Sequence, residues 1–244
     1  MGTLPQFEEA FARVGWFLPP YISMGFLSSL ANDVLRQSSP LTPRELEGRL
    51  ELPYNTVGLA SMACNRYPVA PVISDYKETI GESIKAHFLG LHHVAVAGLV
   101  PVIEGAGRRL LEQRGLNANG VKNVFIALAN DCKRESAERN MGAVGEIESM
   151  MDSFSHYTSN YLYVDSAMYP LVDKTNRHGI THGAYADRDY GSRLNFYKTI
   201  GAVDFLTFIS SFRANISWLA PDTTPASTQL ASFYAQLNRF RHPG

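Results

Sequence analysis

Residues Asn195–Trp218, NFYKTIGAVDFLTFISSFRANISW, form a strongly apolar stretch in the last part of the chain. Its apolar side chains recur three and four positions apart, which is the spacing of one face of a helix. They are Phe196, Ile200, Val203, Phe205, Leu206 and Ile209. We therefore predict that this stretch is a helix and that it packs in the core.

The same helical spacing recurs along most of the chain, and no run of alternating β-branched residues is bounded by hairpin turns. The sequence therefore predicts an all-α helical bundle. Helices are expected over 7–17 and 21–36, and two further helices begin after capping residues. Thr42 precedes Pro43 and Glu45 in a capping-box pattern, and Asn55 caps a helix that runs to about Arg66.

Two long helical regions follow. The first runs over 75–113 and is expected to break or kink near Pro101, and the second runs over 121–163 and is weakened at its middle by Gly142 and Gly145. A turn is predicted between them at 115–120. Near the C-terminus, residues 221–228 have the composition of a linker before an exposed helix over 229–241.

The chain has 244 residues, of which 45% are hydrophobic and 18% charged, which is ordinary for a folded protein with a substantial core. We predict three parts: a helical subdomain at 1–72, a helical bundle at 73–218, and a linker with a C-terminal helix at 219–244. The formal net charge of −1 provides no general attraction to nucleic acid. Binding to phosphate would need a local cluster of basic residues.

Cys64 and Cys132 are the two cysteines, and they suggest neither a disulfide framework nor a closed metal site. The N-terminal sequence lacks the pattern of a secretory signal. The apolar stretch at 89–103 is too short to span a bilayer. We therefore expect a cytoplasmic protein without a membrane segment.

The stretch Asn176–Gly183, NRHGITHG, gathers residues that are unusual in a core. Asn176 is a favoured helix N-cap, and a helix that begins at Arg177 would place His178 and His182 on one face. The N-terminus of such a helix and the forked arginine would both attract phosphate. Gly179 and Gly183 would let a substrate backbone approach.

These residue types suit work on a phosphodiester. A histidine can move a proton to or from a ribose hydroxyl or a leaving oxygen, and an arginine can stabilise charge on phosphorus. Such chemistry requires neither a metal nor another cofactor. Arg177 and His182 stand about 140° apart on an ideal helix, so they converge only if the arginine side chain wraps the first turn.

The string Arg177-His178-Gly179-Ile180-Thr181-His182 resembles the motif of HEPN ribonucleases (higher eukaryotes and prokaryotes nucleotide-binding domains), in which an arginine and a polar residue precede a histidine at this spacing. The following Tyr190–Asn195 is similar to the continuation in bacterial members. The resemblance covers about 84–217. It implies a HEPN-like helical bundle that dimerises, so that two motifs face one cleft, and metal-independent cleavage of RNA.

The resemblance also implies roles for single residues. Arg177 would bind and polarise the scissile phosphate, His182 would act as acid or base, and His178 would orient or assist. Family members often place an acidic or polar residue on an earlier helix, and Glu104 is our candidate. Asn176, Glu104 and Tyr190 are assigned to substrate binding. The family implies a bacterial toxin or anti-phage defence protein, with an antitoxin or another defence partner.

Three other interpretations stay open at this point. His178 and His182 could ligate zinc, although no third ligand is indicated. They could instead satisfy buried polar groups while Arg177 pairs with Asp173 or Asp187. A catalytically inactive HEPN-like dimer could bind nucleotide or a protein partner.

Overall fold

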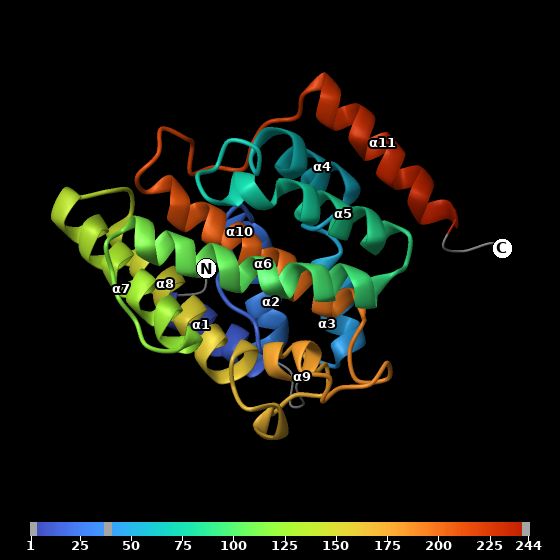
Figure 1. The fold of residues 1–244 in the computed structure, drawn as a ribbon, viewed down its shortest axis with the longest axis horizontal. Helices are drawn as coiled ribbons and strands as arrows, with labels where there is room; N and C mark the ends of the chain where they lie inside the picture. The colour runs from blue at the N-terminus through green and yellow to red at the C-terminus, as the bar shows by residue number, and fades with distance from the viewer. Residues whose placement is uncertain (1–3, 37–40, 241–244) are drawn as a thin grey trace.

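The computed structural model describes residues 4–36 and 41–240, and every regular element in these residues is helical (Figure 1). Arg241 of the last predicted helix and the outer ends of the predicted parts 1–72 and 219–244 lie outside the described residues. The elements are α1 (Leu4–Arg13), α2 (Met24–Arg36), α3 (Pro43–Leu50), α4 (Thr56–Asn65), η1 (Ile73–Tyr76), α5 (Lys77–Phe88), α6 (His92–Gln113), α7 (Val121–Arg139), α8 (Val144–Tyr157), η2 (Thr158–Leu162), η3 (Ser166–Met168), α9 (Arg177–Thr181), α10 (Arg193–Ser211) and α11 (Pro225–Phe240). The prediction of an all-α bundle is confirmed.

Helix α10 is the central element, because every residue from Leu194 to Ser211 is buried. A capping box between Ser192 and Asn195 starts the helix slightly before the predicted Asn195. The predicted end at Trp218 is wrong, since the helix stops at Ser211. The chain then folds back, and the Trp218 indole stacks on Phe212 with the ring centres 4.8 Å apart.

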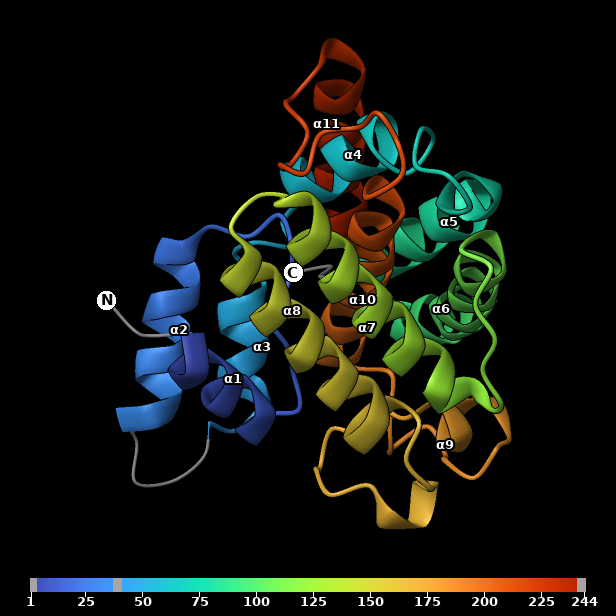
Figure 2. The same ribbon diagram turned by 90° about the vertical axis from the view of Figure 1, so that its left-hand side faces the viewer.

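The other helices surround α10 on all sides (Figures 1 and 2). Helix α6 lies along α10 and α5 lies beside α6, while α7 and α8 form an antiparallel pair at one side of them. Helix α1 packs on α2 and α8, and α3 packs on α10. Helix α11 covers α4 and part of α5. No helix in the described ranges is both long and apolar enough to cross a membrane.

The first long helical region breaks at Gly90, and the break predicted as one outcome near Pro101 does not occur. Gly90 adopts a φ of 81° between α5 and α6, a conformation that favours glycine. Pro101 lies inside α6 with its ring exposed, and burial of the neighbouring Val100 and Val102 holds the helix across it. The predicted break in the second region is confirmed, because α7 ends at Arg139 and α8 begins at Val144.

The C-terminal segment also differs from its prediction. Helix α11 begins at Pro225, inside the predicted linker, because Thr224 and Ser227 exchange backbone and side-chain hydrogen bonds at its start. The helix is not simply exposed, since the buried Tyr234 stacks on Phe88 with the ring centres 4.9 Å apart. At the other end of the chain, α1 stops at Arg13, before the predicted residue 17.

A single hydrophobic core runs through all three predicted parts. Phe11 and Phe17 belong to it, as do Phe154 and Phe205 of the bundle and Tyr234 of α11. The ring of Phe17 contacts Phe154 and Phe205 at 5.1 and 5.7 Å between ring centres. The three-part division of the chain stays a prediction, and the parts share one core.

A buried ion pair connects α10 to the segment that leads into α9. Lys198 Nζ lies 2.9 Å from Asp173 Oδ2, and the two side chains are 1% and 4% exposed. Lys198 also donates to the carbonyl oxygen of Val14 at 2.8 Å, and Asn195 donates to the carbonyl oxygen of Asp173. Asp173 further accepts from Thr175 Oγ1 at 2.5 Å. These bonds determine where the chain enters the NRHGITHG stretch.

We expect Lys198→Met to lower the free energy of unfolding by about 3–5 kcal/mol, because it leaves the Asp173 carboxylate buried without a cation. The measurement is denaturant unfolding followed by circular dichroism. The matched control is Lys133→Met, which breaks the partly exposed pair with Asp152 and should cost less than about 1 kcal/mol. Equal losses in the two variants would contradict the structural role of the buried pair.

Candidate functional site

Asn176 fixes the start of α9, as predicted from its capping preference. Its Oδ1 accepts the backbone N–H of Gly179 at 2.9 Å, and its Nδ2 donates to the carbonyl oxygens of Tyr161 and Val164 at 2.9 and 2.8 Å. Asn176 is fully buried. A side chain without exposed surface does not meet a substrate, so in this structure Asn176 positions α9 and the assignment to substrate binding is not supported.

Helix α9 is only five residues long, so its N-terminus attracts phosphate less than the sequence pattern predicted. A single turn has a small dipole, and the cap already occupies the backbone N–H of Gly179. Gly179 is needed for packing and not for the approach of a substrate, because a Cβ there would lie 2.1 Å from the Tyr185 ring. Gly183 instead has open space around it and a φ of 69°. Any affinity for phosphate must therefore come from side chains.

The side chains of Arg177, His178 and His182 converge on the exposed side of α9. Arg177 Nη1 lies 2.6 Å from His182 Nε2 and 3.3 Å from His178 Nδ1. The arginine thus wraps the first turn, as the spacing required. The two imidazole rings stack with their centres 5.7 Å apart. His182 is exposed, and Arg177 and His178 are half-buried.

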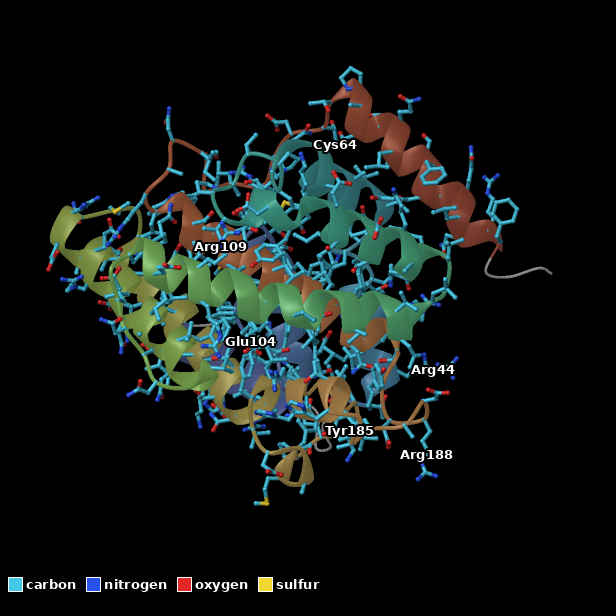
Figure 3. The ribbon with its side chains drawn as sticks, in the orientation of Figure 1. Arg44, Cys64, Glu104, Arg109, Tyr185 and Arg188 are labelled. Carbon is cyan, nitrogen blue, oxygen red and sulfur yellow. The ribbon has the colours of Figure 1, made fainter. Side chains whose placement is uncertain are left out.

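Glu104 reaches the same cluster from α6. Its Oε2 accepts from Arg177 Nε at 2.9 Å, and its Oε1 accepts from Arg108 Nη2 at 3.1 Å (Figure 3 labels Glu104). The structure therefore brings together Arg177, His178, His182 and Glu104, four of the residues singled out in the sequence. Arg108 was missed, although its position four residues after Glu104 on a helix is a recognisable signal. Arg177 pairs with neither Asp173 nor Asp187 among the ion pairs of the described chain.

The hydrogen bonds around Arg177 specify how the histidines carry their protons. A guanidinium only donates, so His182 Nε2 and His178 Nδ1 must act as acceptors in this arrangement. Partial burial lowers the pKa of His178, and the positive charge of Arg177 lowers it further. A histidine in this state is suited to accept a proton.

Tyr190 lies apart from the arginine cluster. Its ring contacts the ring of His93 with the centres 4.9 Å apart, and His93 Nε2 lies 2.9 Å from the carbonyl oxygen of Asp187. Tyr190 lines a shallow hollow together with Arg44 and Arg188. No contact of Tyr190 with Arg177, His178 or His182 is found in the described chain, so its assignment to substrate binding stays a prediction.

Within residues 4–36 and 41–240, no group of three or more histidine, cysteine or acidic side chains is arranged to hold a metal ion. The zinc interpretation of His178 and His182 therefore has no third ligand in that part of the chain. No protein-family model matches the sequence, and no curated protein or solved structure is significantly similar to the chain. The class of protein that the fold defines is an all-helical bundle with a surface cluster of arginine, histidine and glutamate.

We expect Asn176→Ala to lower the free energy of unfolding by about 2–4 kcal/mol. The substitution removes a helix cap and takes the Asn176 amide donor away from the carbonyl oxygens of Tyr161 and Val164. Denaturant unfolding measures the loss, with Asn123→Ala as the matched control because Asn123 donates to one exposed carbonyl. A loss no larger than that of the control would contradict the anchoring role of Asn176.

We expect an NMR titration to place the pKa of His178 below its ordinary value of 6.5. Because the folded pKa is then lower than the unfolded one, the His178 contribution to stability decreases as the pH falls through 6.5. Arg177→Met should raise the pKa of His178, since it removes a neighbouring positive charge. Arg108→Met serves as the control and should leave this titration nearly unchanged. An unchanged titration in Arg177→Met would contradict the assigned contact.

Proposed function

We propose that this protein is a HEPN-like, metal-independent endoribonuclease. The observation that carries the proposal is the contact of one arginine with two histidines and a glutamate at the surface of the bundle. Arg177 Nη2 has no hydrogen-bond partner in the described chain, while Nε and Nη1 are both engaged. The guanidinium is therefore held in place with one donor group left for a phosphate oxygen.

The cluster contains the groups that RNA cleavage by an internal nucleophile requires. A neutral histidine takes the proton of the ribose 2′-hydroxyl, and the 2′-oxygen attacks phosphorus. The bond between phosphorus and the 5′-oxygen breaks, and that oxygen receives a proton from the other histidine, which must first bind a proton from solvent and give up its hydrogen bond from Arg177. Arg177 stabilises the negative charge that develops on the phosphoryl oxygens. The products are a 2′,3′-cyclic phosphate and a 5′-hydroxyl end.

Each residue has one role in this proposal. Arg177 binds and polarises the phosphate, His182 is the exposed acid or base, and His178 assists with the second proton transfer. Glu104 positions the guanidinium through its bond to Nε. None of these steps requires a metal. Arg108, which pairs with Glu104, adds positive charge beside the cluster.

The dimer belongs to the same proposal. Helix α9 lies at the surface, and Met168 and Val172, in the segment before it, are 71% and 83% exposed. A second copy of the chain that covers these apolar side chains would bring two arginine and histidine clusters to one cleft. A role as a toxin or in anti-phage defence in the cytoplasm, with an antitoxin or other defence partner, is part of the proposal through the resemblance to the HEPN superfamily.

A second candidate is a catalytically inactive dimer of the same fold that binds nucleotide or a protein partner. The ion pair of Arg177 with Glu104 favours it, because the carboxylate neutralises charge that a substrate phosphate would otherwise use. In that case the cluster would be a recognition surface only.

We expect purified protein to cleave total RNA or tRNA in excess chelator, and Arg177→Ala and His182→Ala to reduce the rate by at least about 100-fold. The Arg177→Ala and His182→Ala variants are compared with Arg239→Ala and His156→Ala, which change an exposed arginine and an exposed histidine outside the cluster. Both controls should keep full activity. Cleaved ends should carry a cyclic phosphate, and DNA of the same sequence should stay intact.

Circular dichroism and gel filtration establish that all variants fold alike. Intact RNA with the wild-type protein, together with RNA binding that depends on Arg177, would favour the inactive dimer. Cleavage that chelator abolishes would reject the metal-independent mechanism.

A further inference from the structure

A cavity of about 180 Å³ lies at the opposite end of the molecule from α9. Helix α4, which forms one wall, and α9 stand at opposite ends of the bundle in both views (Figures 1 and 2). The other walls come from residues 20–22, from 220–223 and from α10. Its lining includes Tyr21, Tyr54, Val57, Ser61, Met62 and Asp204.

Asp204 is an exception among the deeply buried carboxylates. Asp131 and Glu135 pair with Arg114, and Asp173 pairs with Lys198. Asp204, which is 5% exposed, pairs with no cationic side chain in the described chain. Its Oδ1 accepts from the Tyr67 hydroxyl at 2.7 Å, and no hydrogen bond is found for its Oδ2. Burial raises the pKa of this carboxyl to about 7.

Three hydroxyl groups around the same cavity also lack partners. The hydroxyl oxygens of Tyr21, Tyr54 and Ser61 are buried and make no hydrogen bond in the described chain. Tyr54 and Ser61 are each 4% exposed. Native proteins leave few buried polar groups unpaired, and several around one cavity indicate that something polar binds there.

Arg66, whose guanidinium lies against the cavity-lining Tyr21, is directed elsewhere. Arg66 donates to the carbonyl oxygens of Ser217 and Leu219, and its guanidinium lies 5.5 Å from the centre of the Tyr21 ring. Arg66 forms no ion pair with Asp204 in the described chain. A positive charge for Asp204 would have to come from a bound molecule.

We propose that this cavity binds a small organic amine, whose protonated nitrogen pairs with Asp204 and whose apolar body packs against Val57 and Met62. The volume suits a ligand of one ring, since an apolar cavity of about 150 Å³ holds benzene. The hydroxyl groups of Tyr21, Tyr54 and Ser61 can accept the remaining N–H groups of an ammonium. The site is independent of the arginine cluster and of its proposed ribonuclease activity.

The test is calorimetric titration of the full chain with benzylamine near neutral pH. Benzyl alcohol has a similar shape without the charge, and benzoate carries the opposite charge. We expect saturable binding of one benzylamine per chain, at least about tenfold weaker binding of benzyl alcohol, and none of benzoate. No saturable binding of benzylamine, as expected for a cavity that holds water only, would overturn the proposal. Equal affinities for the amine and the alcohol would overturn the role of the charge.

Variants locate the binding. Asp204→Asn should weaken benzylamine binding at least about tenfold, whereas Asp222→Asn removes the same charge from an exposed residue of the adjoining segment and should leave it unchanged. Val57→Trp is the second variant, because Val57 is 49% exposed and a larger side chain there narrows the cavity without disturbing the core. It should also weaken binding. Unchanged affinity in both Asp204→Asn and Val57→Trp, with folding verified by circular dichroism, would overturn the assignment.

Discussion

The ion pair of Lys198 with Asp173 is the interaction on which the site depends. Helix α10 is buried along nearly its whole length, so a lysine in it must find a carboxylate and further acceptors inside the protein. Asp173 provides the carboxylate, and Val14 provides a carbonyl oxygen. The same aspartate lies three residues before Asn176, whose buried amide caps α9. Burial of one charge in the central helix thus determines where the surface turn with Arg177 is held.

The candidate site combines a backbone anchored in the protein interior with polar side chains at the surface. Asn176 and the ring of Tyr185 hold the backbone of α9, while Arg177, His178 and His182 extend from it. Glu104 extends from α6, which packs directly on α10. Both Glu104 and the side chains of α9 are therefore positioned relative to the same central helix. Such a support reduces the conformational entropy that ordering the side chains around a phosphate would cost.

The buried carboxylates divide into two kinds that suggest two uses. Asp131, Glu135 and Asp173 have cations of the chain itself beside them and contribute to the fold. Asp204 has the hydroxyl of Tyr67 and a cavity. Leaving a carboxyl in that state costs stability, and a bound cation would recover it. The two proposed sites therefore lie at opposite ends of the bundle, with the buried helix α10 between them.

Much of the fold follows from local physics that the sequence expresses directly. Helical periodicity, the caps at Thr42, Asn55 and Asn176, and the break around Gly142 need only nearby residues, and the structure confirms them. The convergence of Arg177 and His182 also follows from spacing, given a wrapped side chain. Tertiary structure decided the rest, because it depends on contacts between distant residues. It ended α10 at Ser211, kept α6 continuous through Pro101, placed Glu104 on Arg177, buried Asn176, and left Asp204 facing a cavity without a cation.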